Sequence, residues 1–376
     1  MVQNMKTRSL KLHLLVVICT LFTSIALAQD SAVFNVSTGS WRLYYKSPET
    51  RQWVQTEYVQ QNAIAPVVQS SVRWNGSTFQ YEYRVSNKRK AKQAIDLFRV
   101  WGIPMIYEIP NLPPRTADFM KDNENWQQQG WAQLDAKDKF EKTVVIAPKG
   151  WRAGLRTDEE VKQTSFVWTP GWKDGDPDGI EPGRSQDGFK AFRNELPGVT
   201  TAKMTGSTEE PWGLDGLPET PFWEQKVAEI HELDYLTVPV LAPIIIIPKP
   251  YNGAELARRI KTHVATWLKL GLITQDTLDR LNRSFDALIA AQTYNNIAGT
   301  HAAVREILKE AYSHHRGLNH NKHEEDEDEH DAEPVKRKAP AAAPLNRVAA
   351  RALSFDLTYL LTRAYILEFK HEVRGG

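Results

Sequence analysis

The chain has 376 residues, of which 25% are charged and 41% hydrophobic, and its formal net charge at pH 7 is +1. Such a composition is typical of a globular protein, and the near-zero charge provides no overall field that would attract nucleic acid or anionic lipid. We therefore expect no nucleic-acid partner. Eleven of the 12 tryptophans precede residue 250, whereas long helical periodicity follows it. This change divides the chain into two predicted domains, at 31–250 and 251–376.

The first 28 residues have the pattern of a secretory signal peptide. A basic stretch precedes an apolar run from Leu14 to Ala28, which ends in small residues before Gln29. The alternative is an anchor that stays in the membrane, but the run is shorter than the roughly 20 residues that a spanning helix needs. We therefore expect an exported protein, periplasmic or secreted, without a stable membrane span. The one cysteine, Cys19, lies in this segment, so no disulfide is expected in the mature chain.

The strongest local signal in the first domain is a hairpin around Asn75-Gly76, a dipeptide that favours tight turns between strands. After it, apolar and polar residues alternate with a period of two, which predicts a half-buried antiparallel strand with Phe79, Tyr81, Tyr83 and Val85 on its inner face. Further strands are expected at 41–45, 94–101, 143–146, 165–168 and 236–247. The last contains Pro239 and Pro243 and is therefore predicted to be bent or to lie at an edge. Many short strands with Gly and Pro between them favour an antiparallel β-sandwich over 31–250, with inserted loops.

The tryptophans suggest a ligand-binding hypothesis. Trp41, Trp74 and Trp101 occur in strand patterns, and we expect them in the core. Four others lie in or beside predicted loops, where an exposed ring can stack on a sugar: Trp126, Trp131, Trp168 and Trp172. The alternative is that these rings also cover the core or pin long loops.

No segment carries a catalytic signature. Gly183–Gly188 contains a serine, but the second glycine comes too late for the nucleophile elbow of serine hydrolases. His231-Glu232 is not followed by the second histidine of a zinc protease motif, so we expect His231 at the surface near the end of a helix. We predict no catalytic residue and no cofactor site. A pair of distant glycosidase carboxylates stays open as an alternative.

Two segments resemble a sandwich module that recurs in exported bacterial proteins. The first is an aromatic strand at 74–87 that ends in Asn87, with an apolar run at 94–100 behind it. The second, at 179–198, matches the pattern I-x-PG-x-S-x-x-GF followed by LPG at Ile180, Pro182, Gly183, Ser185, Gly188, Phe189, Leu196, Pro197 and Gly198. The resemblance implies a β-sandwich and export, and no activity. Pro182-Gly183 is expected to form a type II turn, and Phe189 to point into the core.

The second domain has the period of amphipathic helices. Asn252 and Thr274 are good N-caps, and Gly271 is a good helix stop. Helices are expected at about 252–271, 274–296, 300–317 and 345–369, the last apolar on most of its surface. Four antiparallel helices with short early loops predict a small bundle. The fold class is therefore α+β multidomain, with an antiparallel β-sandwich followed by a small helical bundle.

A low-complexity segment, 318–344, separates the last two predicted helices. Its composition cannot bury enough apolar surface to offset chain entropy, so we expect a disordered linker. Histidines gather in or beside it together with a block of acidic residues: His314, His315, His320, His323 and His330. Imidazole suits Zn²⁺, Ni²⁺ and Cu²⁺, so these residues form a candidate metal site of low affinity. The alternative is a solvated linker that binds nothing.

The helical half resembles the C-terminal modules called FIMAH domains, which are appended to exported bacterial enzymes and adhesins. The similarity lies in Gly271-Leu272-Ile273 and in Leu278–Ala291, whereas Lys309-Glu310 departs from the family pattern. It implies an accessory or attachment role without catalysis. The sequence thus predicts an exported, non-catalytic binding or structural protein of unknown partner, with an extracellular glycan or an envelope protein as the candidates. The alternatives are a carbohydrate-binding or carbohydrate-active protein that uses loop tryptophans, and metal sequestration by the linker.

Overall fold

The computed structural model describes residues 29–75, 78–104, 144–158, 162–171, 179–208, 214–312 and 345–375. The strands are β1 Ser31–Asn35, β2 Ser40–Lys46, β3 Trp53–Val59, β4 Pro66–Trp74, β5 Phe79–Asn87, β6 Ile95–Pro104, β7 Val144–Ile146, β8 Trp151–Asp158, β9 Gln163–Pro170, β10 Arg184–Arg193, β11 Leu196–Gly206 and β12 Leu236–Ile245. The helices are α3 Pro221–Asp234, α4 Gly253–Thr266, α5 Gln275–Thr293, α6 Ile297–Tyr312 and α7 Arg347–Gly375. The described part is an α+β protein, as predicted.

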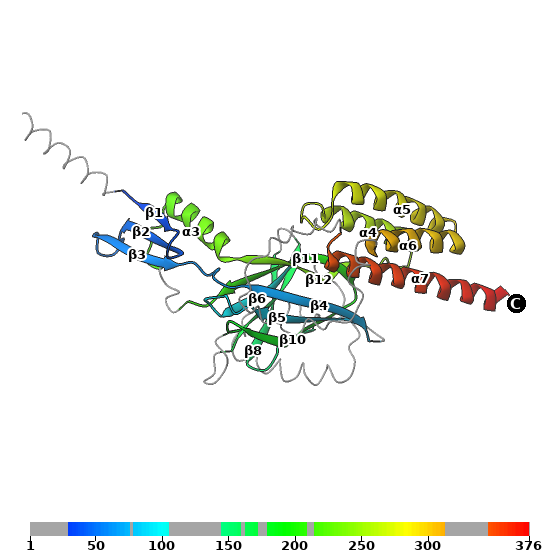
Figure 1. The fold of residues 1–376 in the computed structure, drawn as a ribbon, viewed down its shortest axis with the longest axis horizontal. Coiled ribbons are helices and arrows are strands. Elements are labelled where there is room, and N and C mark those ends of the chain that lie inside the picture. Colours follow the sequence, from blue (N-terminus) through cyan, green and yellow to red (C-terminus); the bar gives the residue numbers. More distant parts are fainter. Residues whose placement is uncertain are drawn as a thin grey trace, which may run out of the picture.

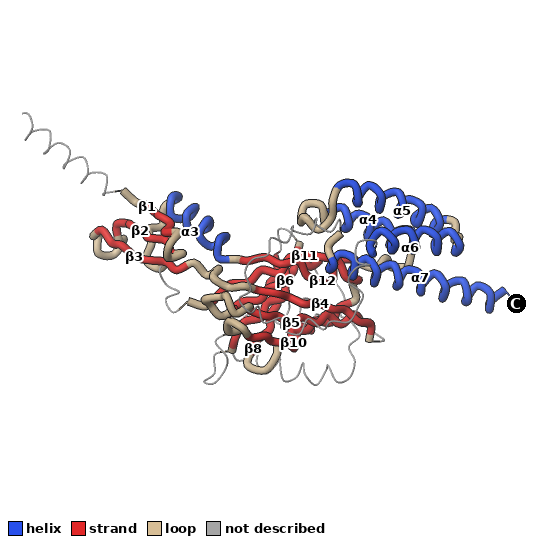
Figure 2. The backbone as a smooth tube through the Cα atoms, viewed as in Figure 1, coloured by secondary structure: helices blue, strands red, loops and turns tan. Residues whose placement is uncertain are grey.

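Three parts follow one another along the molecule (Figure 1). A small sheet, β1-β2-β3, lies at one end with helix α3 beside it. Two larger sheets, β4-β5-β10-β7 and β12-β11-β6-β9-β8, form the middle. Helices α4 to α7 gather at the other end, so that α3 stands apart from the other helices (Figure 2). All strand pairs in the three sheets are antiparallel.

The predicted hairpin is confirmed as β4 and β5. Trp74 pairs with Phe79, and Asn75 and Thr78 are linked across the end of the hairpin by a backbone hydrogen bond of 3.1 Å. The residues predicted on the inner face of β5 are all buried. Tyr83 meets an aromatic cluster from the facing sheet, in which Phe98 and Trp168 stack with ring centroids 5.0 Å apart, whereas Phe79 packs against Phe355 of α7. The inner-face side chains of β5 therefore cover one side of the sandwich core.

Turn and edge predictions in this region are also confirmed. Gly183 has a φ of 79°, and the N–H of Arg184 donates to the carbonyl of Glu181 at 2.9 Å, as in a type II turn. Phe189 is fully buried. β12, which carries two prolines, lies at the edge of its sheet. Proline has no backbone N–H to donate to a neighbouring strand, so it is tolerated at the edge of a sheet better than inside it.

Helices α4 to α7 pack against the sandwich rather than forming a separate globule. Their buried residues belong to the same core cluster as those of the two larger sheets. Asn252 and Thr274 cap α4 and α5 as predicted, by accepting hydrogen bonds from the N–H groups of Glu255 and Thr277. The third helix begins at Ile297, three residues before the predicted Thr300, which is buried and accepts a hydrogen bond from Gln292.

Some predictions fall on residues outside the described ranges. These are the signal segment 1–28, the linker 318–344 and the loop tryptophans other than Trp168. Within the described residues, the helices all lack the combination of length and apolar character that crossing a membrane requires. The predicted core position of Trp74 is wrong, because its side chain is 52% exposed. Trp41 and Trp101 are partly buried.

Candidate functional site

A three-stranded sheet and one helix form a small unit, which we call the satellite module: β1, β2, β3 and α3. Its core is separate from the core of the sandwich and consists of Leu43, Tyr45, Tyr58, Trp223 and Ile230. Because alternate residues of a strand point to opposite faces, one face of the sheet covers α3 and the other is left to solvent. The range 31–250, predicted as one sandwich, therefore contains two cores.

Helix α3 begins with strong local signals. The hydroxyl of Thr220 accepts a hydrogen bond from the N–H of Trp223 at 3.4 Å, and Pro221 occupies the first turn, where its missing N–H costs nothing. The Trp223 ring is buried and packs edge-on against Tyr45, with the ring centroids 5.9 Å apart. This contact fixes the start of the helix on the sheet.

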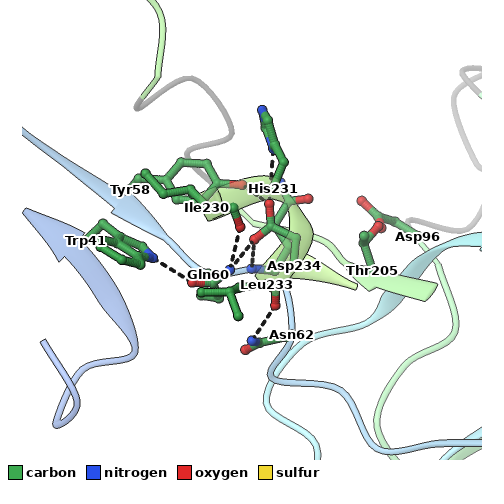
Figure 3. Close-up of polar contacts among 11 residues, drawn as sticks. Trp41, Tyr58, Gln60, Asn62, Asp96, Thr205, Ile230, His231, Leu233 and Asp234 are labelled. Atoms are coloured by element: carbon green, nitrogen blue, oxygen red, sulfur yellow. Dashed lines mark hydrogen bonds and ion pairs between the residues drawn. The ribbon is translucent and has the colours of Figure 1, made fainter. Parts of the chain in front are cut away.

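The end of α3 is fixed by one buried carboxylate. Asp234 is 2% exposed, and both of its oxygens accept hydrogen bonds. Oδ2 accepts from the Tyr58 hydroxyl at 2.6 Å and contacts Nδ1 of His231 at 3.2 Å. Oδ1 accepts from the side-chain amide of Gln60 at 2.8 Å and from the N–H of Gln61 at 3.0 Å. We call these five residues the Asp234 clamp (Figure 3).

The clamp also satisfies carbonyl groups in the last turn of α3, which lack partners inside the helix. The Gln60 amide donates to the carbonyl of Ile230 at 3.0 Å, and Asn62 donates to that of Leu233 at 2.7 Å. The indole N–H of Trp41 donates to the Gln60 side-chain oxygen at 2.7 Å. The short segment after β3 therefore holds the whole end of the helix.

The electrostatics of the clamp favour a permanent hydrogen-bond donor at Tyr58. Burial raises the pKa of its hydroxyl well above the usual range, and the hydrogen bond to Asp234 raises it further. The hydroxyl therefore keeps its proton and donates it to the carboxylate. His231 has a side chain that is 54% exposed and packs edge-on against the Tyr58 ring, as expected for a surface residue near the helix end.

A histidine oriented by a carboxylate is also part of many catalytic triads, so the chemistry of His231 needs to be considered. Among the described residues, the ring of His231 makes its hydrogen bond to Asp234 and none to a serine, threonine or cysteine. No group of three or more His, Cys, Asp and Glu residues in the same part of the chain could hold a metal ion. The carboxylate already accepts from a hydroxyl, an amide and a backbone N–H, so the arrangement acts as a structural joint.

The segment after the clamp is tied into the sandwich by two amide side chains. Gln93 accepts from the N–H of Ala63 at 2.8 Å and donates to the carbonyl of Gln60 at 2.9 Å. Asn87, which is 1% exposed, accepts from the N–H of Ala65 at 3.0 Å and donates to the carbonyl of Ile180 at 3.0 Å. These bonds tie the segment that follows the clamp to the body of the protein.

The solvent face of the module sheet carries aromatic and apolar side chains. Trp53 is 46% exposed and pairs across the strands with Lys46. Tyr44 pairs with Gln55, which makes Tyr44 and Trp53 diagonal neighbours on the same face. The register places further residues on this side, which we call the outer face: Val33, Arg42, Glu57 and Val59. The outer face therefore carries two neighbouring rings, with Trp53 at the start of the edge strand β3.

Of the predicted ligand-binding tryptophans, Trp168 is the one within the described residues, and it does not lie on this face. Trp168 lies in β9, is fully buried, and donates its indole N–H to the carbonyl of Ile146 at 3.0 Å. It is a core residue, which corrects its prediction as an exposed loop aromatic. The other three are outside the described residues, as is the predicted metal site: Trp126, Trp131, Trp172, His314, His315, His320, His323 and His330.

Sequence reasoning missed the clamp and the outer face. Tyr58 and Asp234 are 176 positions apart, and no local motif joins them. A weak signal for the outer face was present, because Trp53 opens a run with the period of a strand. Without knowledge that α3 covers the opposite face, that period does not show which side is exposed.

Comparisons with known proteins add little to this description. No protein-family model matches the chain, and no curated protein matches it at a significant level. One solved structure is similar to part of the chain: an uncharacterized protein from Nocardia farcinica with an immunoglobulin-like fold. It shares 14% sequence identity, and the match covers 36% of this chain and 75% of that one, with a TM-score of 0.22. At this score the likeness carries no argument about function, and the sandwich is defined by its own strand order.

Proposed function

We propose that the chain is an exported, non-catalytic binding or structural protein, and that the outer face of the satellite module is its recognition surface. The observation that carries the proposal is the half-exposed Trp53 ring beside Tyr44, on a sheet whose opposite face is closed by α3. Large exposed apolar side chains gathered on one face mark interaction sites more often than scattered ones do.

The clamp supports this proposal by its effect on the cost of binding. A surface that is already held in place loses little conformational freedom when a partner binds. The Asp234 clamp fixes the end of α3 on the sheet, and the amides of Gln93 and Asn87 tie the segment that follows β3 to the sandwich. Tyr and Trp rings add large contact areas at a small entropic cost, and they dominate the energy of many interfaces.

The experiment compares two exposed tryptophans. The full-length chain, Trp53→Ala and the matched control Trp74→Ala, whose ring is 52% exposed on the sandwich, are screened against an envelope-protein fraction and a glycan array. We expect binding to fall at least tenfold for Trp53→Ala and to stay unchanged for Trp74→Ala. Equal binding by the three chains would contradict the assignment of the outer face.

A carbohydrate ligand is the second candidate, and the diagonal pair of Tyr44 and Trp53 favours it. Sugar rings present apolar faces that stack on aromatic rings, and the neighbouring Gln55 and Arg42 supply hydrogen-bond donors at the rim. The same screen distinguishes the candidates. Binding to glycans with quenching of tryptophan fluorescence supports a carbohydrate ligand, whereas binding confined to envelope proteins supports a protein partner.

Export is the remaining part of the proposal, and it rests on the basic and apolar pattern of residues 1–28. N-terminal sequencing of the protein recovered from a fractionated culture tests it. We expect the chain outside the cytoplasm with Gln29 as its first residue. An intact Met1 in the cytoplasmic fraction would contradict export.

A further inference from the structure

The edge strands of the three sheets differ in how they are protected against pairing with another strand. Natural edge strands avoid such pairing with prolines, charges or very short lengths. In the described part of the chain, five of the edge strands have one of these features: Pro239 and Pro243 in β12, Pro66 and Arg73 in β4, Arg152 and Arg156 in β8, Glu57 in β3, and a length of three residues in β7.

Strand β1 is the exception. Its five residues, Ser31–Asn35, include no charge, no proline and no glycine. Val33 is 56% exposed and Phe34 is 42% exposed, and Val36, in the turn that follows, is 85% exposed. Within the described residues β1 pairs on one side with β2, and its other side faces no strand. β1 is therefore an apolar edge without protection.

We propose that β1 pairs in an antiparallel manner with β1 of a second copy of the chain. A two-fold axis through Val33 places this residue opposite its own copy, Ala32 opposite Phe34, and Ser31 opposite Asn35. Such an interface brings identical patches together, so any charge near the axis would meet the same charge. The absence of charge from β1 removes this repulsion, which makes the strand complementary to itself.

The pairing also covers apolar surface that the monomer leaves to solvent. Phe34 lies on the face that covers α3 and packs against Trp41, with ring centroids 5.2 Å apart. A second β1 strand extends this face and places Ala32 of the second copy beside the Phe34 ring. A contact made by one short strand from each copy is smaller than the roughly 1,200 Å² of a standard interface, so we expect a dimer that depends on concentration. The inference is independent of what the outer face binds.

The first test measures mass. Sedimentation velocity of the full-length chain at increasing concentration should show a monomer that converts to a dimer. Val33→Lys places two ammonium groups across the axis and should abolish the dimer, whereas the matched control Val36→Lys adds the same charge outside the strand and should keep it. A monomer at every concentration, or a dimer that both variants retain, would overturn the proposal.

The second test measures register, and the covalent bond accumulates even when only a small fraction of the chains is paired at any moment. The natural chain has one cysteine, Cys19, so it also serves as the control for background oxidation. Directly opposed residues of antiparallel strands have Cβ atoms about 4.5–5.5 Å apart, near the separation that a disulfide needs. Under mild oxidation, Val33→Cys should form a covalent dimer much faster than Val36→Cys or the natural chain. Equal rates for the three chains would show that β1 strands do not meet at Val33.

Discussion

His263 joins helix α4 to strand β11. The N–H of Val199 donates to Nε2 of His263 at 2.9 Å, and Gly198 makes the approach possible, since a Cβ at this position would lie 2.5 Å from Nε2. Burial lowers the pKa of His263 to about 4. A proton on Nε2 would also remove the acceptor that Val199 uses. The neutral ring is therefore the form that holds α4 against the sheet, and acid should weaken this contact.

The magnitude follows from the two pKa values. The imidazole titrates near pH 6.5 in an unfolded chain and near pH 4 in the folded protein. Between these values the unfolded chain binds more protons, so the contribution of His263 to the free energy of unfolding falls as the pH is lowered from about 6.5 to about 4. It is constant above and below this window. The difference between the pKa values corresponds to about 3 kcal/mol.

The assay isolates His263 by comparison with His263→Gln. The glutamine amide oxygen can accept from Val199, and it does not titrate. Urea unfolding of both chains at pH 7, 5.5 and 4 should show that the natural chain loses about 3 kcal/mol more than the variant over this range. His301→Gln, a histidine of α6, serves as the control. A constant difference between His263→Gln and the natural chain, or a His263 pKa near 6.5 by NMR, would refute this reasoning.

Three further predictions concern single buried positions. Asp234→Ala removes the acceptor that Tyr58, the Gln60 amide and the Gln61 N–H share, so we expect a loss of about 3–5 kcal/mol and faster hydrogen exchange in β1–β3 than in β5. Asp356 is 1% exposed, its Oδ1 has no hydrogen-bond partner among the described residues, and burial raises its pKa. At pH 7 this carboxyl must take up a proton when the chain folds, which costs stability. Urea unfolding of Asp356→Leu should therefore show a free energy of unfolding about 1–3 kcal/mol higher than that of the natural chain at pH 7, and a smaller increase at pH 4. An unchanged free energy of unfolding would contradict the burial of this acid. Gly198→Ala brings a methyl group against His263 and Ile244, and the thermal midpoint should fall by several degrees, which an unchanged midpoint would exclude.

The parts of the fold that depend on neighbouring residues could be predicted from the sequence. The period of two in β5, the caps Asn252 and Thr274, and the Pro182-Gly183 turn each require information from only a few positions. These signals act through local backbone geometry, so they are present in the sequence itself. They were sufficient for the fold class and for the position of most strands and helices.

The candidate site could not be predicted in the same way. The Asp234 clamp depends on a contact between a strand near the start of the chain and a helix that follows β11, and no periodicity links the two. The exposure of a tryptophan side chain also cannot be predicted from the residue type alone. Trp168 was expected at a loop and is buried, whereas Trp74 was expected in the core and is half exposed, because each strand face is covered or left open by elements distant in sequence.

The satellite module is built from two segments that are far apart in the sequence, β1–β3 and α3, so its two parts are synthesised at different times. Ribosomes add roughly 5–20 residues per second, and the Tyr58 side chain is complete 176 positions before the Asp234 carboxylate that it binds. Strands β1 to β3 therefore emerge many seconds before the helix that covers their inner face. During this interval Leu43 and Tyr45 lack the helix that covers them in the folded protein. A polypeptide truncated before Pro221 would never complete this module, however well its first strands were translated.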